Sequence, residues 1–319
     1  MADKIAVIGR IPDAGLTLLN NHGDVHVWDG EPPVDAGVRD LLLRDADAAI
    51  TQLTQPVDAA FLDAAPMLRV VANVAVGYDN IDLEACRARN IRVTNTPGVL
   101  TDATADIAMS LILMSTRRLG EGERLVRSGA AWRWGMFLLL GTSLQNKTLG
   151  IVGMGEIGRA VATRARAFGM RVVYHNRRQV APEVEASLDA RFVPLDELLA
   201  TADVVSLNCP YTTDTHHLLD ADARGSMKPS AFVVNTARGA VIDEAALVDA
   251  LAAGRLAGAG LDVYEHEPEV HPGLVDRDDV VLLPHLGSAT VETRSAMSVM
   301  AASDVLAVLA GHEPDHPVV

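Results

Sequence analysis

The sequence predicts an α/β protein of two parallel-sheet domains, one inserted into the other. Short runs rich in β-branched residues alternate with longer stretches of helical period, which is typical of βαβ units. Many of the short runs are apolar throughout, as strands covered by helices on both faces are. A glycine motif lies in the middle of the chain, where an inserted domain would place it.

The first hundred residues contain five such runs. We expect strands in KIAVIG, VHVWD, AAIT, RVVANV and RVTN, with helices between them. The stretch ADIAMSLILMSTRRL (105–119) predicts a long helix, with Thr101 as its N-cap and Asp102 in the first turn. Pro97 and Gly98 precede this helix and mark an expected crossing between domains.

A second alternating series begins at Thr148. Strands are expected in TLGIVG, RVVYHN, ARFVPL, VVSLNCP, AFVVNTA, GAGLDVY and VVLLPHLG. The last helix, in VETRSAMSVMAASDVLAVLAG, could return to the first domain. We therefore expect one domain at residues 1–98 and 287–319 and a second domain at residues 99–286.

Composition limits the classes of function. The formal net charge of −15 argues against a nucleic-acid or anionic-membrane partner, because both favour a basic surface. The two cysteines, Cys86 and Cys209, form no CxxC pattern, which fits a reduced, cytoplasmic setting. No stretch approaches the roughly 20 apolar residues of a membrane span, and we expect a soluble protein. The histidines form no zinc-like cluster, so no metal is expected, and the adjacent His216 and His217 are given no role.

The segment LGIVGMGEIG (149–158) either binds a phosphate or forms a structural turn without a ligand. Gly153, Gly155 and Gly158 follow a strand-like run and open a helix-like one, which is the context of a dinucleotide site. Gly153 would permit the tight turn, Gly155 would let backbone approach a pyrophosphate, and Gly158 would let helix and strand pack closely. The positive end of the helix dipole would face the anion. The other residues of this expected cofactor loop are Met154, Glu156 and Ile157.

The end of the next strand bears on which dinucleotide is bound. NAD-specific sites usually carry an acidic residue about 20 residues after the glycine motif, which holds the ribose 2′-hydroxyl. This chain has Asn176 there, followed by Arg177 and Arg178, which can make charge-assisted hydrogen bonds to a 2′-phosphate. NADP(H) is therefore favoured, and NAD(H) is the other option. The alternative is that the two arginines simply form a solvated face.

Three polar stretches, NTARG, LDVYEHEP and LLPHLGSAT, follow expected strands at the sheet edge where open α/β sheets bind ligands. Each offers one residue suited to the reduction of an anionic carbonyl compound: Arg238, Glu267 and His285. Taken singly, each has an ordinary explanation: a surface ion pair, a solvated loop acid and a satisfied strand-end histidine.

Ordered motifs over nearly the whole chain resemble the D-2-hydroxyacid dehydrogenase family. The matching segments are NVAVGYDNID, TNTPGVLTDATAD, GMGEIG, NTARGAVIDEAAL, GAGLDVYEHEP and LLPHLGSAT. Within the family, VLTDATAD and NRR look most like the glyoxylate and hydroxypyruvate reductases. The resemblance implies two Rossmann-like or flavodoxin-like domains, an NAD(P)-binding domain inserted into a substrate domain, with the reaction in the cleft between them.

The resemblance also implies roles for the three polar residues. Arg238 would bind the substrate carboxylate and keto oxygen, His285 would donate the proton, and Glu267 would hold this histidine. The chemistry agrees, because hydride arriving at a ketone carbon builds negative charge on oxygen, which a guanidinium stabilises and an imidazolium can protonate. Glu267 would favour the imidazolium form of its partner.

Further substrate contacts follow from the resemblance. The backbone amides of Val76 and Gly77 would receive the carboxylate, and Ser288 would touch the substrate. Leu53 matches a loop that overhangs the substrate, although a core or surface leucine is an alternative.

The resemblance also implies contacts with the cofactor and with a second subunit. Trp132 or Trp134 would reach the active site of the partner in a two-fold homodimer, with interface or core packing as the alternative. Asp262 is expected near the nicotinamide carboxamide. The remaining expected cofactor contacts, besides Arg238 and His285, are Thr104, Cys209, Pro210, Thr215, Thr236, Ala237 and Gly287.

The expected reaction is the NADPH-dependent reduction of glyoxylate or hydroxypyruvate to the D-2-hydroxy acid. Other reductases of the family act on 2-ketogluconate or hydroxyphenylpyruvate, or are phosphoglycerate dehydrogenases, and these stay open as alternatives. A non-catalytic, dinucleotide-sensing scaffold of the corepressor type is a further alternative, against which the intact Arg238, Glu267 and His285 count.

Overall fold

The chain forms two compact units in this computed structural model, which describes residues 2–30 and 33–319. Unit 1 comprises Met1–Leu100 and Ser288–Val319, and unit 2 comprises Thr101–Gly287, so that unit 2 is an insertion in unit 1. The sequence placed these two crossings at 98/99 and 286/287. In the described part of the chain, no helix is both long and apolar enough to cross a membrane.

Unit 1 is built on a five-stranded parallel sheet with the order β2-β1-β3-β4-β5. Its strands are β1 (Lys4–Ile8), β2 (Asp24–Trp28), β3 (Ala48–Thr51), β4 (Val70–Asn73) and β5 (Arg92–Thr94). Its helices are α1 (Asp13–Asn20), α2 (Ala36–Leu43), α3 (Ala59–Asp63), α4 (Leu83–Ala88) and α13 (Val291–Leu309).

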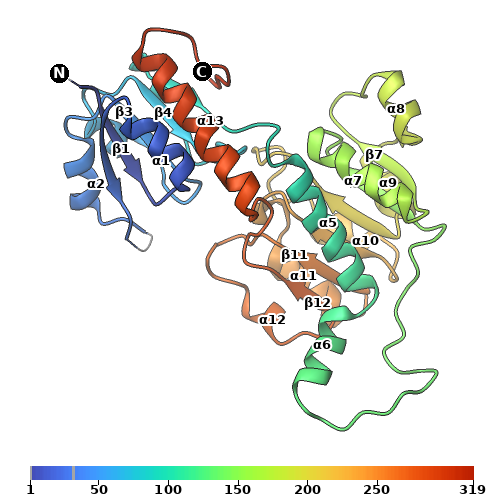
Figure 1. Ribbon diagram of the computed structural model, residues 1–319. Helices are drawn as coiled ribbons and strands as arrows, with labels where there is room; N and C mark the ends of the chain where they lie inside the picture. The colour runs from blue at the N-terminus through green and yellow to red at the C-terminus, as the bar shows by residue number, and fades with distance from the viewer. Residues whose placement is uncertain (1, 31–32) are drawn as a thin grey trace. The chain divides into compact units, whose positions relative to one another are not determined.

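Alternate residues of β1 face opposite cores, as the twofold period of a strand requires. Ile5 and Val7 pack with Ala301 and Val305 of α13, whereas Ala6 and its neighbours pack toward the other face. Figure 1 shows α1 and α13 lying side by side over the first of these faces. The last helix therefore belongs to the same unit as the N-terminal strands.

Unit 2 is built on a seven-stranded parallel sheet with the order β12-β11-β10-β9-β6-β7-β8. Its strands are β6 (Thr148–Val152), β7 (Arg171–His175), β8 (Ala190–Phe192), β9 (Val204–Leu207), β10 (Phe232–Asn235), β11 (Gly258–Leu261) and β12 (Val280–Leu282). Its α-helices are α5 (Thr101–Thr116), α6 (Leu119–Arg127), α7 (Glu156–Ala167), α8 (Pro182–Leu188), α9 (Leu195–Thr201), α10 (Ala221–Gly225), α11 (Glu244–Ala252) and α12 (Pro272–Val275).

Two cores cover the faces of this sheet. Helices α5 and α7 pack on one face, and α9 and α11 pack on the other. The strand order reverses between β6 and β9, which is the point where sheets of this kind bind nucleotides. The predicted fold class is confirmed, because both sheets are parallel and each predicted apolar run contains a strand.

The long helix differs from the prediction at both ends. It begins at Thr101, so Thr101 is the first helical residue and not the N-cap, and its hydroxyl lies 3.4 Å from the Glu156 carboxylate. It ends at Thr116 instead of continuing to Leu119, because Arg118 adopts a left-handed conformation with φ of 53°. A separate helix, α6, starts at the next residue, so the periodic pattern of the sequence concealed a break.

Candidate active site

Three loops at one edge of the unit 2 sheet carry the predicted polar residues. Arg238 follows β10, Glu267 follows β11, and His285 follows β12. These three strands are neighbours and parallel, so their carboxyl ends lie side by side. The structure thus brings together loops that are far apart in the sequence.

Glu267 and His285 form a direct pair. The Nδ1 atom of His285 lies 2.8 Å from Oε2 of Glu267, and the N–H of Tyr264 donates to Oε1 of the same carboxylate over 3.0 Å. Because Nδ1 is occupied in this way, Nε2 is the ring nitrogen left to face a substrate. Burial alone would raise the pKa of Glu267, but the hydrogen bond and charge of His285 outweigh it and hold that pKa below its ordinary value.

Asp262 holds the loop that carries the histidine. Its Oδ1 accepts the N–H of Leu286 over 2.6 Å, and its Oδ2 accepts the N–H of Gly287 over 2.8 Å. The Asp262 carbonyl also accepts the N–H of His285, whose φ of 56° is left-handed. Burial of Asp262 raises its pKa, while these backbone hydrogen bonds oppose the rise. The hydroxyl of Thr104 donates to the Gly287 carbonyl over 3.2 Å and supports the same loop.

The Arg238 loop is fixed by Asn235 at the end of β10. The Asn235 side chain accepts the N–H of Ala237 over 3.0 Å and donates to the Arg238 carbonyl over 2.8 Å. A Cβ atom at Gly239 would lie 1.8 Å from the carbonyl carbon of Tyr264, so only glycine lets this loop touch the Glu267 loop backbone to backbone. The charge of Arg238 also contributes to the low pKa of Glu267.

One histidine that the sequence analysis gave no role joins the same loops. Nε2 of His217 lies 2.6 Å from Oε1 of Glu265, and the N–H of His217 donates to the Ala240 carbonyl over 2.9 Å. The N–H of Glu265 in turn donates to the buried Glu244 carboxylate over 2.8 Å. No local pattern marks this pair, because its members are 48 residues apart.

The glycine loop after β6 fits the phosphates of a dinucleotide. Gly153 has φ of 100°, and a Cβ atom on Gly158 would lie 2.1 Å from the Gly153 carbonyl oxygen. A Cβ atom on Gly155 would meet nothing within 4 Å, and no side chain caps the N-terminus of α7 at this residue. A helix N-terminus without a side-chain cap leaves peptide N–H groups that can bind an anion.

Asn176 is attached to this glycine loop. Its Oδ1 accepts the N–H of Met154 over 2.7 Å. Arg177 and Arg178 follow it on the surface, and no carboxylate in the described residues forms an ion pair with either one.

The remaining predicted cofactor residues lie around the same sheet edge. Cys209 is 9% exposed, and burial raises the pKa of its thiol to about 11. The hydroxyl of Thr215 donates to the Pro210 carbonyl over 2.8 Å and so closes the loop after β9. The hydroxyl of Thr236 is buried without a hydrogen-bond partner in the described chain.

In unit 1, two asparagines bind backbone carbonyls at the predicted carboxylate site. The side-chain amide of Asn95 donates to the Val76 carbonyl over 2.8 Å, and that of Asn73 donates to the Gly77 carbonyl over 2.9 Å. Because a trans peptide sets its C=O and N–H in opposite directions, the Gly77 N–H points away from Asn95. No sequence pattern predicted a role for either asparagine. Leu53 lies half-buried in the same unit, after β3.

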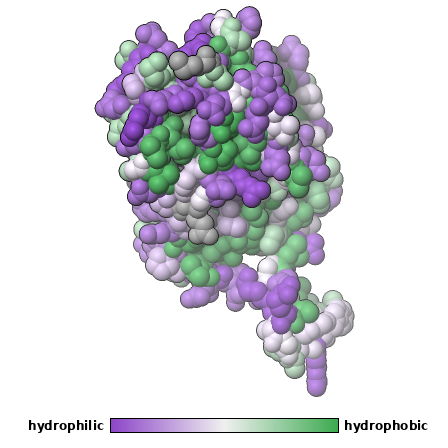
Figure 2. All heavy atoms as spheres, turned by 60° about the vertical axis from the view of Figure 1, so that its left-hand side comes forward, coloured by the Kyte–Doolittle hydropathy of each residue, from purple (hydrophilic) through white to green (hydrophobic). Residues whose placement is uncertain are grey.

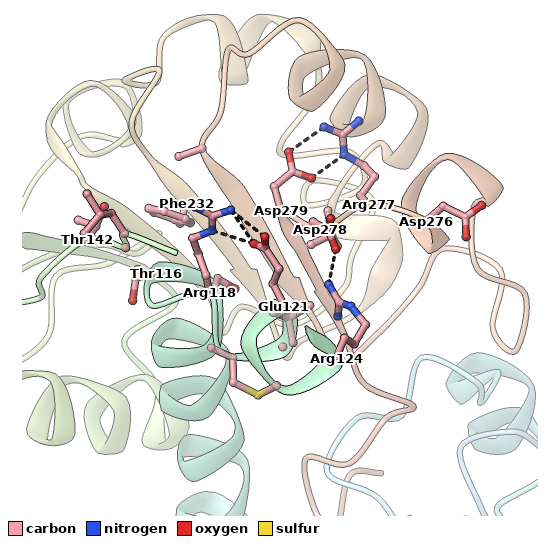
Figure 3. A pocket seen from close by; sticks show the side chains of 18 residues that line it. Thr116, Arg118, Glu121, Arg124, Thr142, Phe232, Asp276, Arg277, Asp278 and Asp279 are labelled. Atoms are coloured by element: carbon pink, nitrogen blue, oxygen red, sulfur yellow. Dashed lines mark hydrogen bonds and ion pairs between the residues drawn. The ribbon is translucent and has the colours of Figure 1, made fainter. Parts of the chain in front are cut away.

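A hollow of about 640 Å³ in unit 2 lies along α6 and the edge strand β12. Its charged side chains pair with one another, as Figure 3 shows: Arg118 with Glu121, Arg124 with Asp278, and Arg277 with Asp279. The predicted reaction residues do not line it. We therefore do not take this hollow as the active site.

Comparisons with known proteins agree with this geometry. Residues 109–287 match the family model described as D-isomer specific 2-hydroxyacid dehydrogenase, NAD binding domain. The chain is 46% identical to a glyoxylate reductase of Thermococcus onnurineus, over 98% of this chain and 95% of that protein.

Two solved structures are similar over the full length. A protein of Thermus thermophilus is 44% identical with a TM-score of 0.92, covering 99% of this chain and 100% of that one. The NADPH-dependent glyoxylate/hydroxypyruvate reductase of Sinorhizobium meliloti, solved with NADP and malonate, is 36% identical with a TM-score of 0.91, covering 100% and 97%. The chain therefore belongs to the D-isomer-specific 2-hydroxyacid dehydrogenase family and is an oxidoreductase that uses a nicotinamide dinucleotide.

Proposed function

We propose that this protein reduces a small 2-keto acid with NADPH, either hydroxypyruvate to the D-2-hydroxy acid or glyoxylate to glycolate, which has no stereocentre. The observation that carries the proposal is the 2.8 Å pair of His285 and Glu267, in which the loop of Glu267 also touches the Arg238 loop. The activities for which the similar proteins from Thermococcus onnurineus and Sinorhizobium meliloti are named support the choice of substrates.

In the proposed mechanism, each residue has a chemical task. His285 donates a proton from Nε2 to the keto oxygen, while Glu267 holds Nδ1 and stabilises the imidazolium. The Arg238 guanidinium stabilises the negative charge that grows on this oxygen. The nicotinamide ring supplies the hydride when it is bound.

The carboxylate of the keto acid has its own proposed partners. We assign its binding to the N–H groups of Val76 and Gly77. Asn95 supports the orientation of the Gly77 N–H, because it binds the Val76 carbonyl of the same peptide. The peptide of the Val76 N–H is held through the Ala75 carbonyl, which accepts the N–H of Thr96 over 2.9 Å. Leu53 and Ser288 complete the proposed substrate contacts. Asp262 is proposed to lie near the nicotinamide carboxamide, although both of its oxygens also accept backbone N–H groups.

A preference for NADPH over NADH is part of the proposal. The exposed Arg177 and Arg178 follow the strand next to the glycine loop, and no acidic residue stands at position 176. Two guanidiniums favour a ribose 2′-phosphate, because charge-assisted hydrogen bonds are each worth about 1.5 to 3 kcal/mol.

We also propose a cytoplasmic homodimer. Helix α6 has no buried residue, and the segment that follows it exposes Trp134 by 78% and Phe137 by 87%. In Figure 2 this segment lies at the lower end of the view, where some green side chains reach the surface. Exposed large apolar side chains gathered in one segment point to an interface, and a second copy of the chain is the proposed occupant. We assign to Trp134 a contact with the active site of the partner subunit, and the free thiols of Cys86 and Cys209 fit the cytoplasm.

A substrate panel tests the proposed function. Glyoxylate, hydroxypyruvate, 2-ketogluconate and hydroxyphenylpyruvate are each supplied with NADPH and with NADH, and nicotinamide absorbance is followed. We expect the highest kcat/KM with glyoxylate or hydroxypyruvate and NADPH. A higher kcat/KM with another keto acid would contradict the substrate assignment, and no turnover with any of them would favour a non-catalytic scaffold.

A further inference from the structure

The loop that carries the two arginines is anchored at both ends. At its start, Asn176 accepts the N–H of Met154 from the glycine loop over 2.7 Å. At its end, the N–H of Val180 donates to the hydroxyl of Tyr174 over 3.0 Å. Arg177 and Arg178 lie between these two anchors, so the loop has little freedom to swing its arginines away from the glycine loop.

Tyr174 supplies the anchor from inside the sheet. Its side chain is fully buried on β7, and its ring packs edge-on against Phe192 at 5.4 Å. Its hydroxyl donates to Oε1 of Glu185 on α8 over 2.7 Å while it accepts from Val180. Burial, followed by the hydrogen bond to Glu185, raises the pKa of Tyr174 to about 12, so the hydroxyl keeps its proton under ordinary conditions.

Glu185 is the centre of the network. The side-chain amide of Gln179 donates to Oε1 over 2.9 Å and to Oε2 over 3.1 Å. The Tyr174 hydroxyl and this amide together lower the pKa of Glu185 and keep it ionised. The hydrogen bonds of Glu185 go to Tyr174 and Gln179, and no ion pair joins it to Arg177 or Arg178 in the described structure.

We propose that Tyr174, Gln179 and Glu185 are positioning residues for cofactor selectivity, which hold the 176–180 loop so that both guanidiniums face a ribose 2′-phosphate. This inference rests on the proposed preference for NADPH. A loop held in its binding conformation loses less entropy when the ligand binds, which strengthens the contact without adding a new one. None of the three side chains needs to touch the phosphate.

The test uses two fragments of the cofactor that differ by the 2′-phosphate. Binding of adenosine 2′,5′-bisphosphate and of adenosine 5′-monophosphate to the full-length protein is measured by calorimetry. We expect Tyr174→Phe and Glu185→Gln each to raise the dissociation constant of the bisphosphate about tenfold, which is about 1.4 kcal/mol. The dissociation constant of the monophosphate should rise less than about twofold. Gln179→Ala changes an exposed residue, so it tests the network in a variant that leaves the core intact, and we expect a loss in the same direction.

Glu183→Gln is the matched control. Glu183 lies on the same helix, is exposed, and its substitution removes the same negative charge without touching the network. A pure charge effect would make both Glu→Gln variants bind the 2′-phosphate slightly more tightly. The proposed network predicts loss for Glu185→Gln and no loss for Glu183→Gln.

The outcomes separate this inference from the proposed function. Arg177→Ala/Arg178→Ala could weaken binding of the bisphosphate more than binding of the monophosphate, while the three network variants do not. In that case the positioning role is wrong and the NADPH preference stands. If the arginine variant weakens both fragments equally, the NADPH preference itself is wrong. Network variants that weaken both fragments equally would show a merely structural role and would also overturn the inference.

Discussion

At the scale of single residues, the Glu267 carboxylate carries a prediction about pH. Its pKa is lowered in the folded protein, so the pair with His285 contributes stability above the ordinary carboxyl pKa and loses it as pH falls through the folded-state pKa. Glu267→Gln removes the titrating group. We expect the melting temperature of wild type to exceed that of the variant at neutral pH and the difference to shrink below about pH 4. A difference that stays constant across this range would contradict the ionised pair.

The same variant is expected to affect catalysis. A glutamine side chain in place of the carboxylate can still accept a hydrogen bond from Nδ1, but it no longer stabilises the imidazolium, so kcat should fall by about 10² while the dissociation constant of NADPH changes little. Steady-state kinetics with hydroxypyruvate and calorimetry with NADPH measure the two quantities. An unchanged kcat would show that Glu267 does not assist His285.

Asn95 carries a prediction about substrate binding. Its amide holds the Val76 carbonyl, so Asn95→Ala frees the peptide that presents the Gly77 N–H. We expect the KM for hydroxypyruvate to rise about tenfold, because one hydrogen bond to a charged group is worth about 1.5 to 3 kcal/mol. Asn20→Ala, an exposed asparagine at the end of α1, is the control and should leave KM unchanged. Equal KM values for the two variants would show that Asn95 does not support substrate binding.

The contrast between predicted and missed residues has a physical cause. Arg238, Glu267 and His285 follow strand ends, and parallel neighbours bring such ends together, so topology and family resemblance both predict their place. The side chains of Asn73 and Asn95 donate to backbone carbonyls, and no sequence pattern identifies an asparagine with this role. The pair of His217 and Glu265 likewise depends on two loops that meet only in the folded sheet.

At the scale of elements, apolar runs predicted the strands well because a buried parallel strand must be apolar on both faces. Helix ends were harder to predict. The periodic pattern before Leu119 continues through Arg118, although Arg118 is left-handed and separates α5 from α6. A backbone break with no glycine or proline at its site cannot be predicted from composition.

Asp203 carries a prediction about how β6 and β9 are joined. Its Oδ2 accepts the N–H of Thr148 over 2.8 Å, and its Oδ1 receives the Lys228 ammonium over 3.0 Å. Burial would raise the pKa of Asp203, but these partners lower it. We expect Asp203→Asn to lower the free energy of unfolding by about 1 to 3 kcal/mol, measured by urea denaturation. A loss below a few tenths of a kcal/mol would show that the backbone hydrogen bonds alone join these strands.

At the scale of the whole molecule, the exposed segment after α6 carries the prediction of a dimer. We expect light scattering to give twice the mass of one chain, and Trp134→Ser/Phe137→Ser to shift the protein toward the monomer, because a few aromatic side chains carry most of the energy of an interface. Met67→Ser also removes an exposed apolar side chain, which is 59% exposed in unit 1, and should leave the dimer intact. A wild-type monomer would contradict the proposed assembly.

The central claim is that His285, held by Glu267, protonates a keto acid as hydride arrives. The most direct measurement is single-turnover oxidation of NADPH by hydroxypyruvate in wild type, His285→Ala and the control His312→Ala, with the chirality of the product determined. We predict that wild type and the control form D-glycerate at equal rates and that His285→Ala is slower by at least about 10² with unchanged NADPH binding. A wild-type rate in His285→Ala, or the L-product, would contradict the account.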